Sequence, residues 1–338
     1  MNLGFNFYGK ERTMKIFMTG GTGNIGQYVT KALLEAGHSL VLYTRTPERI
    51  PGIGEEKNTV LVKGNILELG VMRRALKDCD AVIHIALGWG NTPLDMLDHD
   101  TRVTVSLLEG AEEAGLKNFI YTSSTAVYGP NQDGASEKSM RTPANLYGAT
   151  KSASEVFLLG YRQNYGGQGK PGEKVGIRRN IIRPGYTFSN PAYEGGASQS
   201  DKRFRDIARA VLKGEDLTLS DYDGTQFISS AQLAQLYLKL VESDLNEEIF
   251  NGLGETFTSW AEIARWTVAC VPGTKSKVLP PPGESPRTPV HTHVDKIKEV
   301  FGLSFDAAAE LKEHVRWNVE RERRALAGEQ VHDVYHVW

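Results

Sequence analysis

The stretch of sequence that decides the fold is Lys15–Gly26, which reads K-I-F-M-T-G-G-T-G-N-I-G. Its first five residues form a short apolar run typical of a buried strand. Gly20, Gly23 and Gly26 follow at G-x-x-G-x-x-G spacing, and apolar residues at helical spacing come directly after them. A tight structural turn would use the same glycines. Between a strand and a helix, however, they are typical of a dinucleotide site, because they let the backbone approach a pyrophosphate at the helix N-terminus.

Outward from this stretch, strand-like apolar runs alternate with helical patterns as far as Pro184. The predicted strands are residues 15–19, 40–43, 60–63, 81–85, 118–122 and 176–183. The predicted helices are residues 27–36, 70–77, 103–114 and 147–161. This alternation predicts an α/β protein with a doubly wound parallel sheet, the Rossmann fold, whose ligand lies beyond the carboxyl ends of the strands.

The pattern loosens after Pro184 into a loop-rich stretch and scattered helical segments. These segments are residues 202–213, 231–241, 259–269 and 307–324. We therefore predict a NAD(P)-binding Rossmann domain over residues 14–184 and a smaller, mainly helical substrate-binding region over residues 185–338. Residues 224–241 are expected to return to the Rossmann domain.

Composition excludes several classes of protein. The 338 residues carry a formal net charge of -2, which gives no general attraction to nucleic acid or to an acidic membrane. No apolar run approaches the roughly 20 residues that span a bilayer, and the N-terminus lacks a secretory signal pattern. Two cysteines, Cys79 and Cys270, are too few for a disulfide framework. We expect a cytoplasmic protein that acts on a small molecule.

Tyr147 and Lys151 stand four residues apart and therefore share one face of a predicted helix. A tyrosine with an ordinary pKa of about 10 is a poor base at neutral pH, but a nearby cation favours the phenolate and lowers that pKa. Such a pair also occurs on ordinary helix surfaces. The hydroxyls of Thr122, Ser123 and Ser124, at the end of the preceding predicted strand, favour an acid-base site.

The end of the second predicted strand bears on the choice of cofactor. An NAD site of this architecture usually has Asp or Glu there to bind the adenosine ribose. This chain has Arg45 near that place. A guanidinium can pair with the 2′-phosphate of NADP, although a solvated turn residue would look the same. We expect NADP to be preferred and NAD to be possible.

Four motifs now stand together: T-G-G-T-G-N-I-G, Y-T-S-S-T-A-V-Y-G (residues 121–129), Tyr147-x-x-x-Lys151 and I-I-R-P-G (residues 181–185). Together they resemble the NAD-dependent epimerase/dehydratase family of extended short-chain dehydrogenases, over about residues 14–240. The resemblance implies that Tyr147 is the general acid and base, that Lys151 binds the nicotinamide ribose, and that Ser124 hydrogen-bonds the reacting oxygen.

The resemblance and the glycine spacing also define the residues expected around the ligands. At the cofactor they are Gly20, Gly23, Asn24, Ile25, Gly26, Asn65, Ile66, Ala86, Leu87, Gly88 and Pro184, besides Arg45, Tyr147 and Lys151. The substrate candidates are Trp89, Thr125, Tyr128 and Tyr186. Trp89 and Tyr128 lie just beyond strand ends, so they either line the substrate or pack against the second domain.

Departures from the family pattern concern the substrate. Family dehydratases carry an Asp-Glu pair where this chain has Thr125-Ala126, so water elimination is not expected. Members that bind nucleotide sugars usually show an Arg and an acidic pair around the stretch that here reads G-T-Q-F-I-S-S-A-Q-L-A (residues 224–234). Substitutes for this diphosphate clamp are Arg178, Arg203, Arg205 and Arg287. A smaller sugar, sugar acid, polyol or hydroxyketone is therefore the expected substrate.

Three functions fit the same residues. The first is an oxidoreductase that moves hydride at a secondary alcohol or ketone with exchangeable cofactor. The second is a sugar or nucleotide-sugar epimerase with tightly bound NAD, and the third is a non-catalytic NADP-binding regulator. We expect no metal site, because the histidines lack suitable ligand spacing, and we interpret His84 as a hydrogen-bonded core residue. The predicted helices 103–114 and 152–161 correspond to those that pair relatives into homodimers.

Overall fold

The computed structural model describes residues 13–130, 132–161, 176–198 and 201–331. These residues form a seven-stranded sheet in the order β11-β6-β5-β4-β1-β2-β3, with every neighbouring pair parallel. The strands are β1 (Lys15–Thr19), β2 (Ser39–Thr44), β3 (Thr59–Lys63), β4 (Ala81–His84), β5 (Asn118–Thr122), β6 (Arg178–Pro184) and β11 (Ile249–Gly252). The order reverses between β1 and β4, and this is the point where doubly wound sheets bind their ligands.

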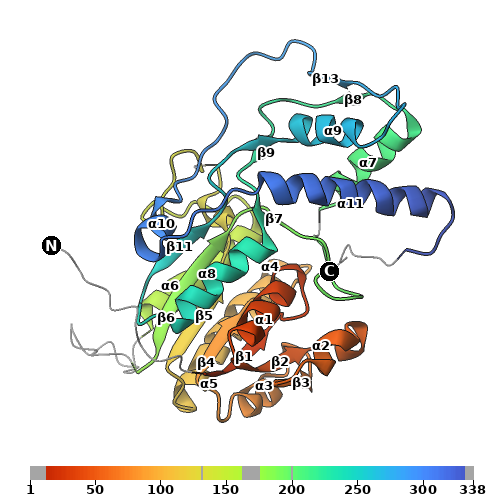
Figure 1. Cartoon of the computed structure of the whole chain (residues 1–338). Coiled ribbons are helices and arrows are strands. Elements are labelled where there is room, and N and C mark those ends of the chain that lie inside the picture. Colours follow the sequence, from red (N-terminus) through yellow and green to blue (C-terminus); the bar gives the residue numbers. More distant parts are fainter. Residues whose placement is uncertain (1–12, 131, 162–175, 199–200, 332–338) are drawn as a thin grey trace.

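Helices cover both faces of the sheet, as Figure 1 shows. On one face lie α1 (Asn24–Glu35), α2 (Pro51–Glu55) and α8 (Ser230–Glu242), and on the other α3 (Leu69–Ala75), α5 (Arg102–Glu113) and α6 (Leu146–Gly160). Alternation along β1 explains the two layers, since Ile16 and Met18 pack under α1 while Phe17 packs under α5. The predicted doubly wound α/β fold is confirmed.

The remaining chain forms a smaller region in which α7 (Arg203–Lys213), α9 (Trp260–Ala269) and α11 (Ala308–Leu326) lie together (Figure 1). They enclose a cluster of rings that includes Phe188, Phe204, Phe227 and Trp260. Short strand pairs tie this region to itself: β7 (Thr187–Phe188) with β10 (Ile228–Ser229), β8 (Leu217–Thr218) with β13 (Val278–Leu279), and β9 (Gly224–Thr225) with β12 (Thr258–Ser259).

Two elements differ from the sequence expectation. The strand β11, followed later by α10 (Asp295–Phe301), joins the sheet beside β6, although its I-F-N-G segment is too short to stand out as a strand. Residues 93–101 are helical, with α4 (Pro93–Met96) leading into the π-helical turn η2 (Leu97–Thr101). Single 3₁₀ turns occur at η1 (Pro47–Arg49) and η3 (Thr125–Tyr128). Within the described ranges, no helix is long and apolar enough to cross a membrane.

Candidate active site

The glycine turn after β1 lies directly against the chain that leaves β4. Gly20 has a φ of +74°, and a Cβ added to it would stand 2.6 Å from the amide nitrogen of Ala86. A Cβ on Gly26 would stand 1.9 Å from the carbonyl oxygen of Gly20. Both positions therefore need glycine for the close approach, and the turn opens onto the crevice between β1 and β4.

The N-terminus of α1 is available to an anion. Gly23 is its N-cap, and no side chain caps the first turn. The Asn24 side chain is engaged elsewhere, since it donates to the Thr187 carbonyl at 3.2 Å and accepts from the Ser189 hydroxyl at 2.5 Å. Ile25 packs against the core. The turn therefore offers backbone N–H groups to a pyrophosphate, and this cradle fits a dinucleotide cofactor.

The expected adenosine end lies at the carboxyl ends of β2 and β3. Arg45 follows β2 and is exposed, and no carboxylate of the described chain forms an ion pair with it. Asn65 is also exposed, and its carbonyl accepts a hydrogen bond from the Tyr43 hydroxyl at 2.8 Å. Ile66 is half-buried beside the core under α3. The structure thus places Arg45, Asn65 and Ile66 on one edge of the sheet.

The loop after β4 carries the next group of cofactor candidates. Ala86 and Leu87 are half-buried, and Gly88 is buried so closely that a Cβ would meet the His99 carbonyl at 2.1 Å. Trp89 is 47% exposed, and its ring centroid lies 6.2 Å from that of Tyr147. Of the substrate candidates, Trp89 is therefore the one that stands beside the proposed acid-base residue with an open face.

The start of α6, which carries Tyr147 and Lys151, packs against the turn that begins at Ser124. Asn145 caps the helix by accepting from the Gly148 amide at 2.8 Å. A Cβ on Gly148 would stand 2.6 Å from the Ala126 carbonyl, so the helix contacts the turn that begins at Ser124. The hydroxyl of Ser124 is half-buried and accepts from the Ala126 amide at 3.1 Å. Tyr147 is half-buried one residue before this contact.

Lys151 follows Tyr147 by one turn of α6 and is buried. Its Nζ donates to Asp100 Oδ1 at 3.2 Å and lies 5.0 Å from the centroid of the Tyr121 ring. Burial alone would lower the pKa of Lys151, but the Asp100 carboxylate and the nearby phenols outweigh it, so the pKa is raised. Sequence reasoning missed Asp100, because nothing in T-P-L-D-M-L-D-H-D-T distinguishes it from its neighbouring aspartates.

His84 is a core residue, as the sequence suggested. Its Nδ1 lies 2.6 Å from the Thr19 hydroxyl and its Nε2 lies 3.1 Å from the Thr104 hydroxyl. Burial, together with the charge of Lys151, lowers the pKa of His84 to about 3, so the ring is neutral at pH 7. Across the described chain, no group of three or more His, Cys, Asp or Glu side chains is placed to hold a metal ion.

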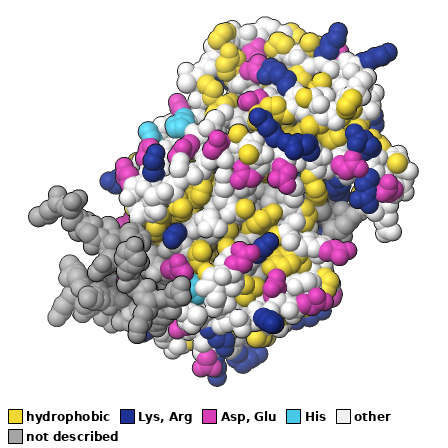
Figure 2. Space-filling view, viewed as in Figure 1, with side chains coloured by type: hydrophobic (Ala, Val, Ile, Leu, Met, Phe, Trp, Pro, Cys, Tyr) yellow, Lys and Arg dark blue, Asp and Glu magenta, His cyan; other side chains and the backbone are white. Residues whose placement is uncertain are grey.

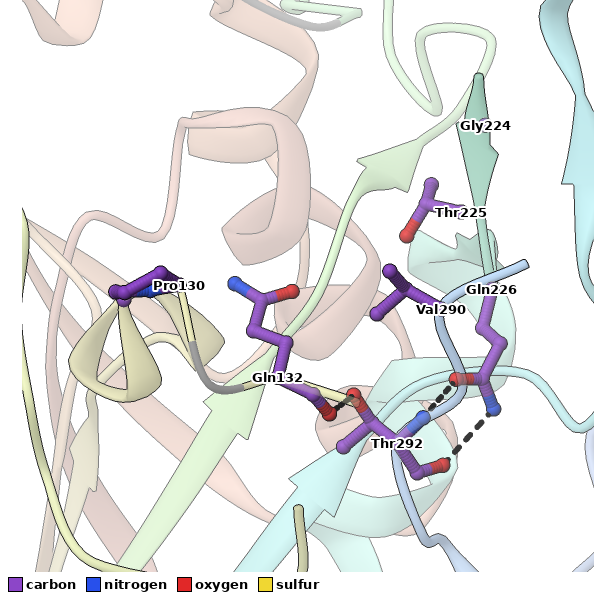
Figure 3. Close-up of a pocket in the computed structure, with 8 residues that line it drawn as sticks. Pro130, Gln132, Gly224, Thr225, Gln226, Val290 and Thr292 are labelled. Atoms are coloured by element: carbon purple, nitrogen blue, oxygen red, sulfur yellow. Dashed lines mark hydrogen bonds between the residues drawn. The ribbon is translucent and has the colours of Figure 1, made fainter. Parts of the chain in front are cut away.

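A cavity of about 220 Å³ lies between the Ser124 turn and the C-terminal region (Figure 3). Three segments line it: Gly129, Pro130 and Gln132; Gly224, Thr225 and Gln226; Val290 and Thr292. Gln226 holds the third segment by accepting from the Thr292 amide at 2.6 Å and donating to its carbonyl at 3.0 Å. Gln132 donates to the Thr125 carbonyl at 3.3 Å. The lining residues carry amides and hydroxyls but no formal charge, and they adjoin the Ser124 turn.

The structure corrects one substrate candidate, Tyr128. Tyr128 is fully buried, and its hydroxyl lies 2.7 Å from both Asn251 Oδ1 and the Arg183 guanidinium, so it packs the interior and offers no surface to a substrate. Tyr186 packs edge-on against Phe227 and Trp260, at 4.9 and 5.5 Å between centroids. It is half-buried, and its contact with a substrate stays a prediction. The substrate candidate Thr125 and the cofactor candidate Pro184 are both buried.

Most of the arginines considered as a diphosphate clamp form ion pairs with nearby aspartates. Arg178 is wrong for this role, because it lies at the amino end of β6, whereas the glycine turn follows the carboxyl end of β1. Its side chain pairs with Asp244 at 2.5 Å. Arg203 pairs with Asp201 at 2.7 Å and lies over the Trp260 ring. Arg205 pairs with the adjacent Asp206 at 2.8 Å, whereas Arg287 is exposed.

A Rossmann sheet with a glycine turn at the switch point, and with a Tyr-x-x-x-Lys helix packed on the turn after β5, is typical of a short-chain dehydrogenase/reductase of the extended type. Within this class, residues 16–251 match the NAD dependent epimerase/dehydratase family. The match covers more than half of the chain, and the chain belongs to this family of NAD-dependent enzymes.

Sequence identity to individual relatives is low. The chain is 28% identical over 169 residues to an uncharacterized UDP-glucose epimerase of Bacillus subtilis, and the match spans 45% of this chain and 53% of that protein, about half its length. It is 26% identical to a UDP-N-acetyl-alpha-D-glucosaminuronate decarboxylase of Bacillus cytotoxicus, over 90% of this chain and 97% of that one. The fold is similar to that of UDP-glucuronic acid 4-epimerase from Bacillus cereus in complex with NAD, with a TM-score of 0.73, 19% identity, and coverage of 95% of this chain and 100% of that one.

Proposed function

We propose that this protein is a sugar epimerase that removes hydride from a secondary hydroxyl carbon and returns it to the opposite face. The observation that carries the proposal is the contact of the Tyr147–Lys151 helix with the Ser124 turn, beside the glycine cradle. The relatives named above include a UDP-glucose epimerase and a UDP-glucuronic acid 4-epimerase, which favours epimerisation over the net oxidation expected from sequence.

Each residue then has one task in the reaction. Tyr147 takes the hydroxyl proton as base and later returns it as acid. Ser124 donates a hydrogen bond to the oxygen as it becomes a carbonyl. Lys151 holds the nicotinamide ribose, one helical turn along α6 from Tyr147. The bound cofactor supplies the acceptor and donor of hydride.

The cavity supports a sugar as the substrate. Thr225, Gln226 and Gln132 present hydroxyl and amide groups, which suit the hydroxyls of a sugar. The relatives' names point to a nucleotide-linked sugar, so UDP-sugars are the first candidates. The uncharged lining favours a second candidate function, net oxidation of a free sugar or polyol, because it provides no cation for a diphosphate.

We further propose that NADP binds more tightly than NAD. The exposed guanidinium of Arg45 supports this, since it stands where an acidic residue would repel a 2′-phosphate. Known structures of similar fold are described in complex with NAD. The affinity for NADP is therefore to be measured against the affinity for NAD.

We also propose a cytoplasmic homodimer. Val156 and Phe157 project from α6 with 53% and 54% of their surface exposed, and an apolar pair of this kind favours a helix-mediated contact between two copies. On the face in Figure 2, positive and negative side chains are interspersed, which favours small-molecule substrates over a polyanionic partner.

The test is to incubate the purified protein with UDP-glucose, UDP-glucuronic acid and UDP-N-acetylglucosamine, and in parallel with free sugars and polyols, in the presence of NAD or NADP. NMR reports inversion at a sugar carbon, and absorbance reports reduced cofactor. Inversion without accumulated reduced cofactor supports the epimerase. Stoichiometric reduced cofactor with an oxidised product supports the second function, and turnover that persists in Tyr147→Phe contradicts both.

A further inference from the structure

The ion pair of Asp100 and Lys151 is buried beside the proposed catalytic tyrosine. The side chains of Asp100 and Lys151 are 0% and 3% exposed, and the distance from Nζ to Oδ1 is 3.2 Å. The other carboxylate oxygen, Oδ2, is buried and has no hydrogen-bond partner among the described residues. Burying a charged group away from water costs free energy unless an opposite charge balances it. Asp100 and Lys151 therefore act as one neutral unit.

The chain holds Asp100 in place through the π-helical turn η2. Thr104 donates to the Asp100 carbonyl at 2.8 Å, and Thr101 donates to the Thr150 carbonyl of α6 at 3.1 Å. On its other side the turn contacts the cofactor loop, because Gly88 leaves room for the His99 carbonyl. Single π turns inside helices are frequent at functional sites. Here the turn joins the cofactor loop to the catalytic helix.

The other titratable groups around Lys151 come from four elements: His84 of β4, Tyr121 of β5, Tyr147 of α6 and Tyr237 of α8. Burial lowers the pKa of His84 and raises the pKa of Tyr121 and of Tyr237, so these three side chains are neutral at pH 7. Among the described groups around Lys151, the carboxylate of Asp100 is the one that forms an ion pair with the ammonium.

We propose that Asp100 is a positioning residue that supplies the counter-charge of Lys151 and thereby lets the site accept the positively charged nicotinamide of the oxidised cofactor. The inference rests on the proposed role of Lys151 at the nicotinamide ribose. Without the carboxylate, an unbalanced ammonium in a region of low dielectric repels the oxidised ring but not the neutral, reduced one. The two forms of the cofactor report this difference directly.

The test compares the dissociation constants of NAD⁺ and NADH in wild type and in Asp100→Asn, by calorimetry and by NADH fluorescence. The amide keeps the size of the side chain and an oxygen for Lys151. The ratio of the NAD⁺ constant to the NADH constant should rise by roughly tenfold, as expected for one nearby unit charge inside a protein. Asp98→Asn is the matched control, because Asp98 lies on the same turn but is 54% exposed and pairs with Arg102 at the surface.

A double variant separates charge balance from structural support. Asp100→Asn combined with Lys151→Gln restores a neutral pair, so the ratio should return to the wild-type value even if both forms of the cofactor bind more weakly. If Asp100→Asn fails to fold, the double variant should fold, because it contains no unbalanced ammonium. An unchanged ratio in folded Asp100→Asn, or a double variant as perturbed as the single one, would overturn the proposal. These measurements need no substrate, so failure of the proposed epimerase reaction does not affect them.

Discussion

The cofactor end of the candidate site is formed by backbone contacts, whereas the substrate end is formed by side-chain hydrogen bonds. At the cofactor end, backbone meets backbone at Gly20 and Gly26, and there is no room for a side chain. At the substrate end, Gln132, Gln226 and Thr292 come from segments far apart in the chain and meet through side-chain hydrogen bonds. The first construction fixes the cofactor class whatever the substrate. The second can change residue by residue without changing the fold.

The largest expected effect lies at the proposed acid-base residue. Tyr147→Phe removes one phenolic oxygen and should lower turnover by about 10²- to 10⁴-fold, the usual contribution of a general acid or base. Cofactor affinity should remain close to wild type, because the ring still packs beside Trp89. Steady-state rates and cofactor titration measure the two quantities separately.

Tyr193→Phe is the matched control for that experiment, since its hydroxyl bonds Glu56, a residue just after α2 and away from Tyr147. It should leave turnover unchanged. Near-normal turnover in Tyr147→Phe on a verified substrate would show that the acid-base assignment is wrong.

The next effect tests the backbone construction of the cofactor end. Gly26→Ala places a Cβ 1.9 Å from the Gly20 carbonyl, so the turn must shift. We expect the free energy of unfolding to fall by about 1–3 kcal/mol, as for other overpacked sites, and cofactor affinity to fall with it. Gly160→Ala, at the end of α6 with no atom of the described residues within 4 Å of the new Cβ, should lower neither the free energy of unfolding nor cofactor affinity. Chemical denaturation and cofactor titration would refute the expectation if both variants behaved alike.

The smallest effect concerns the rim of the cofactor end. Arg45→Ala should reduce the preference for NADP over NAD by about two- to fivefold, the size of a solvent-exposed ion pair, and should leave NAD binding unchanged. Arg265→Ala, which removes an exposed arginine paired with Asp221, serves as the control. If wild type binds NAD as tightly as NADP, or if Arg45→Ala keeps the preference, the role of Arg45 is wrong.

The sequence predicts the backbone part of this site far better than the side-chain part. Glycine spacing and apolar runs are local signals, and they correctly placed the turn at Gly20–Gly26 and the core strands around it. Tyr128 and Trp89 both lie a few residues after a predicted strand, yet Tyr128 is buried against Arg183 and Trp89 is open. Such differences arise from packing between distant segments, which a single sequence does not display.

Asp100 illustrates the same limit in a different way. It stands in a polar stretch with Asp95 and Asp98, and only the π turn directs it inward while Asp98 stays at the surface. The strand β11 escaped prediction because Ile249 and Phe250 are followed at once by Asn and Gly. Its parallel pairing with β6 depends on residues that are far away in the chain.

The return of the chain to the sheet determines when folding can finish during synthesis. Until residues 249–252 leave the ribosome, β6 is an open edge whose N–H and C=O groups lack their partners. Until α8 has emerged, the apolar side of α1 is uncovered as well. A nascent chain that ends at Pro184 therefore holds the complete glycine motif but exposes the edge of β6 and the apolar side of α1, two kinds of surface that favour aggregation.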